Sequence, residues 1–399
     1  MRRVVVVGAS AAGLSAAETL RRAGFDGDLT VVGQERHLPY DRPPLSKQIL
    51  TGAWEPERAM LRRPADLDAL RLDLRLGVRA AALAPAARTV TLDDGAELPY
   101  DGLVVATGVR PRRLPGCGTP GVHVLRDLPD ALALRDRLTA GGRLVVVGAG
   151  FLGAEAASAA RSLGVSVTLV EPAAVPLAHA VGERVGTFLA RVHRDHGVDL
   201  RVRAKVVEIV TGAGRATGVR LADGTVIPAD DVLVAVGSRP NTEWLHGSGL
   251  DLADGVVCDR YSAAGPGVYA AGDVARWYHP LFGTTLRVEH RTNAAEQAMT
   301  AARNLLDPAH AKPFAPVPYF WSDQYGLRLQ AFGHLRGHDE AQVVDGDLAD
   351  GRFLVAYGRA GKLTGALAVG MPPKALHQWR AAIAARTGWR APSTDSLPA

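Results

Sequence analysis

Two short glycine-rich segments carry the residues whose types and spacing point most directly to chemistry. Residues 8–13 read GASAAG and residues 148–153 read GAGFLG, so both follow a GxGxxG pattern, with Ser10 in place of the middle glycine of the first copy. In this pattern the first glycine permits a tight turn, the second lets the backbone approach a pyrophosphate, and the third lets a helix pack closely on a strand. The N–H groups at the start of that helix bind phosphate oxygens. The sequence therefore predicts two dinucleotide sites, with contacts from Gly8, Ser10, Ala12, Gly13, Gly148, Gly150, Phe151, Leu152 and Gly153.

An acidic residue indicates which nucleotide the second site prefers. Glu171 directly follows the aliphatic segment 165–170. A carboxylate at this point accepts hydrogen bonds from both hydroxyls of an adenosine ribose and repels a 2′-phosphate, so we expect NADH to be preferred over NADPH. In the first copy the aligned residue is Gly33, and both Gln34 and Glu35 stay open as the side chain that meets the ribose.

The segments around both motifs form an internal repeat. An aliphatic strand precedes each motif, at residues 4–7 and 144–147, and an alanine-rich helical stretch follows it. Gly24 and Gly164 stand where a helix C-terminal cap is expected, and second strands follow at residues 29–32 and 165–170. Strand, glycine turn, helix and strand are the unit of a parallel doubly wound sheet.

The remaining chain predicts further domains. Residues 202–210 and 219–227 are typical of a β-meander inserted in the second repeat, and the proline-rich residues 308–318 of a linker. The last eighty or so residues alternate as strands and end in a helix near residues 373–385. We expect an α/β protein with two Rossmann-like domains of the glutathione-reductase type and a C-terminal α+β domain. The expected boundaries are 1–110 with 238–312 for FAD, 111–237 for NAD, 316–390 for the C-terminal domain and 391–399 for a tail.

Composition excludes several other classes. The chain has 399 residues, of which 47% are hydrophobic and 22% charged, as in ordinary globular proteins. Its aliphatic runs are too short for a membrane span, and no signal peptide is recognisable, so a cytoplasmic location is expected. Cys117 and Cys258 stand alone, which leaves no candidate metal site or redox dithiol. The net charge of +5 comes mainly from scattered arginines, with no basic block that would indicate nucleic acid.

Residues 38–47, LPYDRPPLSK, resemble the YDRPPLSK stretch of FAD-dependent, NADH-oxidising ferredoxin reductases. These include the putidaredoxin-reductase, biphenyl-dioxygenase-reductase and rubredoxin-reductase types. The resemblance extends along the whole chain through ATG (106–108), VGSRPN (236–241), AGD (271–273), VEH (288–290), NAAEQA (293–298) and FWSDQY (320–325).

The resemblance implies roles at the flavin. Arg42 would reach the phosphate and adenosine side of FAD, and Lys47 the isoalloxazine, where a fixed cation favours the reduced form. Asp273 would accept hydrogen bonds from the ribityl hydroxyls, and Arg126 would contact FAD. Other expected cofactor contacts are Ala80, Thr107, Gly108, Gly237 and Gly272.

A second group is implied where the nicotinamide meets the flavin. Glu155 would orient the nicotinamide carboxamide, Glu289 and His290 would lie at the meeting edges, and Trp321 would pack against the same rings or, alternatively, in the core. Lys47, Glu155, Glu289 and Trp321 are the candidate catalytic residues. Arg291 departs from the family, which usually has an aromatic residue there, so its partner among flavin, nucleotide and protein is open.

No redox cysteine lies near residues 38–47, although the disulfide reductases and peroxidases of this fold carry one. A flavin alone can take a hydride and release single electrons, which suits an iron–sulfur acceptor. We therefore expect an NADH:ferredoxin reductase that supplies an oxygenase, such as a haem-thiolate monooxygenase. The alternatives are a rubredoxin or monodehydroascorbate reductase and a redox-signalling flavoprotein similar to apoptosis-inducing factor.

The expected partner is a small acidic ferredoxin, docking near Arg110, Arg112 and Arg113, with no nucleic acid and no membrane insertion. The protein itself would be a monomer or a homodimer.

Overall fold

The computed structural model describes residues 1–389, so the predicted tail at 391–399 lies outside the described residues. The chain divides into two compact units. The first unit comprises Met1–Asp41, Ala59–Arg110 and Arg239–Pro318, and the second comprises Arg42–Arg58, Pro111–Ser238 and the described residues from Tyr319 onward. The domain boundaries expected from the sequence stay a prediction, because compactness alone does not assign a cofactor to a unit.

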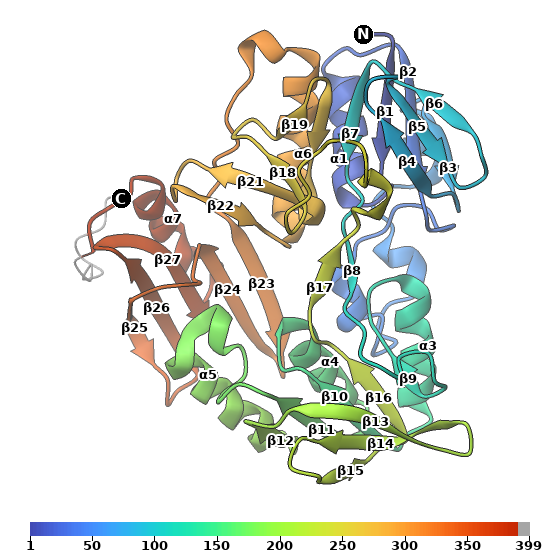
Figure 1. Ribbon diagram of the computed structural model, residues 1–399. Helices are drawn as coiled ribbons and strands as arrows, with labels where there is room; N and C mark the ends of the chain where they lie inside the picture. Colours follow the sequence, from blue (N-terminus) through green and yellow to red (C-terminus); the bar gives the residue numbers. More distant parts are fainter. Residues whose placement is uncertain (390–399) are drawn as a thin grey trace. The chain divides into compact units, whose positions relative to one another are not determined.

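The first unit is built on a six-stranded sheet in the order β19-β20-β7-β1-β2-β3, with α1 and α6 packed against each other (Figure 1). All its neighbouring strands are parallel except β19 and β20. The bounds are β1 (Arg3–Val7), α1 (Ala11–Arg22), β2 (Asp28–Gly33), β3 (Asp73–Leu76), β7 (Gly102–Val105), β19 (Ala263–Gly265), β20 (Val268–Ala270) and α6 (Arg291–Leu306).

Alternation along β1 explains how one strand is buried on both faces. Val4 and Val6 belong to the core that holds the alanines of α1 and α6, whereas Val5 and Val7 belong to the core on the other face. Successive side chains of a strand point to opposite faces, so a continuous valine run suits a sheet covered on both sides. The glycine-rich turn therefore begins at the end of a strand that is packed on both faces.

Two small three-stranded sheets complete the first unit. One contains β4 (Ala80–Ala84), β5 (Thr89–Leu92) and β6 (Glu97–Pro99), and the other contains β18 (Val256–Cys258), β21 (Ala275–His279) and β22 (Thr284–Arg287). Short helical segments of the first unit are α2 (Pro64–Asp68), η3 (Glu243–Leu245), η4 (Gly272–Val274) and η5 (Pro308–His310), and η2 (Pro56–Ala59) lies where the chain returns to this unit from the second.

The second unit repeats the parallel design. Its five-stranded sheet has the order β12-β11-β10-β16-β9, and the antiparallel β13-β14-β15 sheet shares a hydrophobic core with it. The bounds are η1 (Pro43–Ser46), β9 (Val122–His123), α3 (Leu128–Thr139), β10 (Arg143–Val147), α4 (Phe151–Ser162), β11 (Ser166–Glu171), α5 (Ala178–Asp195), β12 (Asp199–Val202), β13 (Val206–Gly212), β14 (Arg215–Leu221), β15 (Val226–Pro228) and β16 (Asp231–Val234). The predicted β-meander is confirmed, although its first strand begins at Val206.

The C-terminal part of the second unit is a five-stranded antiparallel sheet in the order β23-β24-β27-β26-β25. Apolar residues of α5, including Val185 and Phe188, share a core with this sheet, which is why α5 is amphipathic. The bounds are β23 (Tyr319–Gln324), β24 (Leu327–Gly333), β25 (Glu340–Asp347), β26 (Arg352–Arg359), β27 (Lys362–Val369), η6 (Pro373–Leu376) and α7 (His377–Ala384).

The strands β8 (Val109–Pro111) and β17 (Ser238–Pro240) pair as a two-stranded ribbon where the chain passes from one unit to the other. Among the helices of residues 1–389, none is both long and apolar enough to cross a membrane.

Candidate functional site

The first glycine loop joins β1 to α1 with no room for side chains. A Cβ at Gly8 would lie 2.1 Å from the Ala106 carbonyl oxygen, and one at Gly13 would lie 1.7 Å from the Gly8 carbonyl oxygen. The φ of +119° at Gly8 also favours glycine. Ser10, at the N-cap of α1, makes no side-chain capping hydrogen bond, so the helix start is not capped by its own hydroxyl. The loop therefore fits the backbone cradle that a pyrophosphate needs.

The second glycine loop, between β10 and α4, has the same construction. A Cβ at Gly148 would lie 2.5 Å from the Ala235 carbonyl oxygen, and one at Gly153 would lie 2.0 Å from the Gly148 carbonyl oxygen. At Gly150 a Cβ would meet nothing within 4 Å, so the backbone there borders open space. Helix α4 also lacks a side-chain cap. This loop too fits a dinucleotide phosphate.

The acidic residue at the second loop is held by the backbone. Glu171 ends β11, and its carboxylate accepts hydrogen bonds from the N–H of Ala149 at 2.8 Å and of Ala173 at 2.9 Å. The carboxylate is thus fixed beside the glycine loop, where a ribose would lie in this type of fold.

The corresponding position of the first repeat cannot carry a side chain. Gly33 ends β2, and a Cβ there would lie 2.6 Å from the Ala9 Cβ. Glu35 accepts a hydrogen bond from the Tyr40 hydroxyl and is partly buried, whereas Gln34 is exposed. Which of the two side chains meets a ribose stays a prediction.

Lys47 and Glu155 are brought together inside the second unit. The Lys47 Nζ lies 2.6 Å from Glu155 Oε2, and the ammonium also donates to the Pro43 carbonyl oxygen at 3.1 Å. Glu155, which is 6% exposed, also accepts from the Ser46 hydroxyl at 2.5 Å and the Ser322 hydroxyl at 2.6 Å. These three donors replace the hydrogen bonds to water that a buried carboxylate loses.

Three chain segments meet at this carboxylate. Glu155 lies in the first turns of α4, Ser46 and Lys47 close η1, and Ser322 lies in β23. A cavity of about 500 Å³ adjoins the cluster, and its wall includes Lys47, Glu155 and Tyr325. Helix α4, which follows the second glycine loop, is therefore joined through Glu155 to strand β23 of the C-terminal sheet.

Arg42 and Arg126 are also neighbours in the second unit. The Arg42 guanidinium donates to the Arg126 carbonyl oxygen at 2.6 Å. The N–H of Arg126 donates to Asp130, whose carboxylate closes a capping box at the start of α3 with Asp127. Burial, together with the nearby Asp127 charge, raises the pKa of Asp130. The two predicted FAD arginines are thus positioned by one helix N-terminus.

Thr107 and Gly108 belong to a turn in the first unit that is clamped by Asn241. The Thr107 hydroxyl donates to the Asn241 carbonyl oxygen at 2.8 Å, and the Asn241 side-chain amide donates to the Thr107 carbonyl oxygen at 2.9 Å. Gly108 and Gly237 both have positive φ, of 64° and 95°. Two of the quoted motifs therefore form one turn structure.

Gly272 and Asp273 lie in η4, against α6. The Gly272 N–H donates to Gln297 Oε1 at 3.0 Å, and Gln297 is fully buried. A Cβ at Gly272 would lie 3.1 Å from the Ala12 Cβ, so this loop comes close to the start of α1. The first glycine loop and the AGD motif are therefore adjacent, as a shared flavin site requires.

His290 is the N-cap of α6, and its neighbours are engaged by charges of the first unit. Arg291 forms an ion pair with Asp41, in the YDRPP stretch, which gives this departure from the family a partner within the protein. Glu289 forms an ion pair with Arg287.

The remaining predicted residues have less distinctive surroundings. Trp321 is partly exposed, not enclosed in the core, and its ring stacks near Tyr319 with centroids 6.1 Å apart. Phe151 packs edge-on against Phe320 at 4.9 Å, and Leu152 is 37% exposed. Ala80 is partly buried at the start of β4.

Three residues of these sites are missing from the set expected from the sequence. Ser46 and Ser322 donate to Glu155, and Arg287 contacts Glu289 and the Asp273 backbone. Each lies within two residues of a predicted residue, so the motifs contain them. Only the folded chain shows which neighbour points inward.

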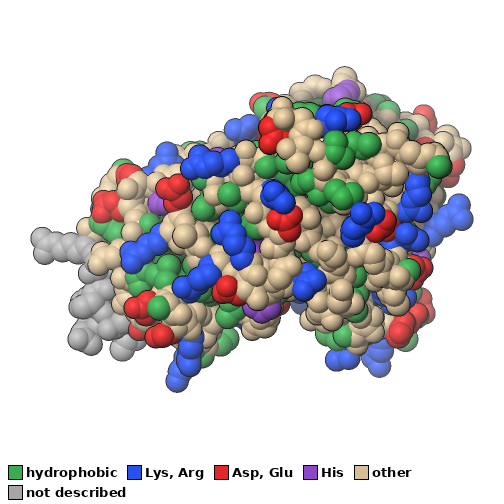
Figure 2. All heavy atoms as spheres, turned by 90° about the horizontal axis from the view of Figure 1, so that it is seen from below, with side chains coloured by type: hydrophobic (Ala, Val, Ile, Leu, Met, Phe, Trp, Pro, Cys, Tyr) green, Lys and Arg blue, Asp and Glu red, His purple; other side chains and the backbone are tan. Residues whose placement is uncertain are grey.

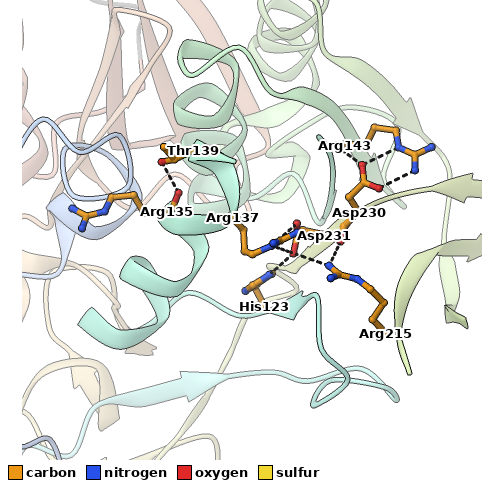
Figure 3. Close-up of polar contacts among 8 residues, drawn as sticks. All are labelled: His123, Arg135, Arg137, Thr139, Arg143, Arg215, Asp230 and Asp231. Carbon is orange, nitrogen blue, oxygen red and sulfur yellow. Dashed lines mark hydrogen bonds and ion pairs between the residues drawn. The ribbon is translucent and has the colours of Figure 1, made fainter. Parts of the chain in front are cut away.

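A buried carboxylate lies at the N-terminal ends of the strands in the second unit's parallel sheet, away from the glycine loop. Asp231, at the start of β16, is 4% exposed and lies 2.9 Å from His123 Nε2 and 3.1 Å from Arg137 Nε (Figure 3). Arg143 forms two side-chain hydrogen bonds with Asp230, and these bonds lower the pKa of Asp230 to about 2. This network lies at the beginning of the strands, whereas the glycine loop follows their ends, so its role is to hold α3, β9 and β16 together.

Comparison with known proteins gives a consistent result. A family described as pyridine nucleotide-disulphide oxidoreductase matches residues 2–298, and one described as reductase C-terminal matches residues 319–394. The ferredoxin–NAD(+) reductase component of the anthranilate 1,2-dioxygenase system of Burkholderia cepacia is 41% identical, over 92% of this chain and 90% of its own. Putidaredoxin reductase of Pseudomonas putida is 37% identical, over 89% of this chain and 85% of its own.

Among solved structures, the covalent putidaredoxin reductase–putidaredoxin complex matches with a TM-score of 0.92 at 34% identity, covering 96% of this chain and 93% of the matched chain. These similarities confirm the predicted reductase family, the α/β fold and the oxidoreductase class. FAD with a nicotinamide dinucleotide is the cofactor pair of this family, in agreement with the expected cofactors. The chain therefore belongs to the pyridine nucleotide-disulphide oxidoreductase family, as a member that also carries the reductase C-terminal domain.

Proposed function

We propose that this protein is an FAD-containing NADH:ferredoxin reductase that supplies electrons to an oxygenase. The observation that carries the proposal is the pair of glycine loops, each shaped for a dinucleotide, in a chain with no cysteine in the segment that contains Lys47. When bound, FAD supplies hydride acceptance from NADH and release of electrons one at a time.

The two cysteines offer no support for dithiol chemistry. Cys258 is buried, and burial raises the pKa of its thiol to about 12. Cys117 is partly exposed in a different unit. The Cys258 thiol therefore stays protonated, and a protonated thiol does not act as a nucleophile in thiol–disulfide exchange.

The family resemblance implies that Glu155 orients the nicotinamide carboxamide, but we propose that its main role is to position Lys47. Both of its oxygens already accept hydrogen bonds from Ser46, Lys47 and Ser322. The carboxylate holds the Lys47 ammonium in one place, and Lys47 in turn supplies the cation expected beside the isoalloxazine. Any contact between Glu155 and the carboxamide of the nicotinamide would come in addition to these bonds.

The donor is proposed to be NADH, on the position of Glu171 beside the second glycine loop. The proposed acceptor is a small acidic ferredoxin, because relatives are named as ferredoxin reductase components and putidaredoxin reductase. We also propose the cytoplasm as its location, where NADH would be available as donor.

Docking of a ferredoxin depends on where positive charge is free. Arg110 forms an ion pair with Glu243. The exposed Arg112, whose Nε donates to the Ser238 carbonyl oxygen at 2.8 Å, and the exposed Arg113 are therefore the candidates from the predicted cluster. On the face shown in Figure 2, lysine and arginine side chains are scattered among acidic ones and do not form one patch. A local pair of arginines is therefore the feature to test.

The direct test combines spectra and electron transfer. The purified protein is expected to be yellow, and acid should release its FAD into solution, because the expected contacts are all non-covalent. NADH should bleach the flavin, and cytochrome c should then be reduced only when a ferredoxin is added. Flavin that stays with the acid-precipitated protein would contradict non-covalent binding. Reduction of rubredoxin or monodehydroascorbate in place of every ferredoxin in a panel would contradict the proposed acceptor.

A further inference from the structure

Arg287 links two parts of the predicted flavin site in the first unit. It is the last residue of β22, two positions before Glu289, and only 13% of its side chain is exposed. A guanidinium with so little exposure needs partners for most of its donors.

The partners of Arg287 are specific. Its Nη1 donates to Glu289 Oε1 at 2.6 Å and to the Asp273 carbonyl oxygen at 3.2 Å. On the other side of the guanidinium, Nε lies 3.4 Å from Asp254 Oδ2, which is an ion pair without a hydrogen bond. Nη1 thus bridges the AGD loop and the VEH segment, and a second carboxylate lies beside the guanidinium at ion-pair distance.

The neighbouring carboxylates keep the Arg287 guanidinium protonated. Burial by itself lowers the pKa of the Arg287 guanidinium, but the carboxylates of Glu289 and Asp254 outweigh burial, and the pKa is raised. The planar fork of arginine can donate in several fixed directions at once, whereas lysine supplies a single point charge. Lysine at this position would keep the charge and lose the bridge.

We propose that Arg287 is a positioning residue of the flavin site, which fixes the Gly272–Asp273 turn and the Glu289 carboxylate relative to each other. The inference rests on the proposed function, because a flavin must be bound for the roles that the family resemblance implies for Asp273 and Glu289. Arg287 acts through these two residues.

Arg276 provides a matched control. It lies opposite Arg287 in the β21–β22 pair, and its guanidinium donates to the Ala253 carbonyl oxygen at 2.8 Å. It therefore shares the sheet and the type of hydrogen bond, but among residues 1–389 its described contacts do not include Asp273 or Glu289.

The experiment measures FAD affinity by reconstituting apoprotein of the parent, Arg287→Lys and Arg276→Lys while following flavin fluorescence. We expect about tenfold or more weaker binding for Arg287→Lys, which corresponds to ~1.4 kcal/mol, and less than a twofold change for Arg276→Lys. With FAD saturating, the flavin midpoint potential of Arg287→Gln should fall, because Glu289 loses its counter-charge. A tenfold change in the two-electron equilibrium would be ~30 mV, and Arg276→Gln should show none of it.

A third comparison uses Glu289. In a Glu289→Gln background, Arg287→Gln should shift the flavin midpoint potential much less than in the parent. The carboxylate whose charge Arg287 balances is absent from that background. If Arg287→Lys matches Arg276→Lys in FAD affinity and Arg287→Gln matches Arg276→Gln in potential, the inference is overturned, even if the melting temperature drops. Failure of the parent protein to bind FAD would instead overturn the proposed function.

Discussion

Lys47 Nζ and Glu155 Oε2 form an ion pair of 2.6 Å, in which only 12% and 7% of the two side chains are exposed. The desolvation of two charges at such a place is costly and is offset only when further hydrogen bonds satisfy them. Ser46, Ser322 and the Pro43 carbonyl provide those bonds. Removing one partner would leave the other charge buried without its counterion.

Glu155→Gln should therefore slow flavin reduction by NADH at least tenfold while the protein still retains FAD. The amide keeps the shape but cannot balance the Lys47 charge. Stopped-flow absorbance of the flavin measures the rate. Ser158→Ala is the control, because Ser158 lies in α4 and bonds only the Tyr325 N–H among the contacts described. Equal rates for the parent and Glu155→Gln would make Glu155 an ordinary helix residue.

Glu171→Ala should narrow the preference for NADH over NADPH by about tenfold or more, which is ~1.4 kcal/mol. The variant removes the negative charge that would repel a 2′-phosphate and the acceptor for the Ala149 N–H. The ratio of kcat/KM for the two donors measures the effect. Glu208→Ala, an exposed strand residue of the same unit, should leave the ratio unchanged. Equal efficiency with both donors in the parent protein would refute the assignment.

His193 should make the protein less stable as the pH falls from about 6.5 towards 4. Burial lowers the pKa of this imidazole to about 4, with smaller contributions from His196 and Arg194. Between these pH values the unfolded chain binds a proton that the folded chain does not, so stability rises with pH and is fully present above the unfolded pKa. The loss corresponds to the order of ~3 kcal/mol for one buried histidine.

Urea unfolding at pH 7 and pH 4.5 measures this loss, and His193→Gln should reduce the difference between the two pH values. The variant keeps a group able to bond the Tyr325 hydroxyl, which now lies 2.8 Å from His193 Nδ1. His310→Gln is the control, because that histidine is exposed. The same pH difference in the parent and in His193→Gln would assign the effect to other groups.

Ferredoxin-dependent reduction of cytochrome c should fall with salt, and more so in the parent than in an Arg112→Glu/Arg113→Glu variant. Steering charges raise association rates and are screened beyond ~8 Å at physiological ionic strength. Arg201→Glu/Arg220→Glu changes the net charge equally at an exposed and a half-buried strand residue and should keep the parent's salt dependence. Ferricyanide reduction should not distinguish the variants. A ferredoxin rate indifferent to salt and to both substitutions would remove these arginines from docking.

The sequence by itself determined the local chemistry of this protein. A strand of valines followed by GxGxxG can bury both faces of the strand and still turn tightly, so both repeats could be placed from residue order alone. Glu171 followed from the same reasoning, because its place at a strand end is a property of sequence spacing. The long motif resemblance then predicted the reductase family.

Only the tertiary structure decided which distant residues meet. Glu155 takes its donors from residues 109 positions before it and 167 positions after it, at Ser46 and Ser322, and no periodicity encodes such a pairing. Helix α5 was likewise not singled out by any motif, because its apolar face is completed by the C-terminal sheet. Arg291 could be recognised as unusual but not given a partner, since Asp41 lies 250 positions away. Spacing along the chain determines strands, turns and helix starts, whereas long-range contacts depend on how the packed elements bring side chains together.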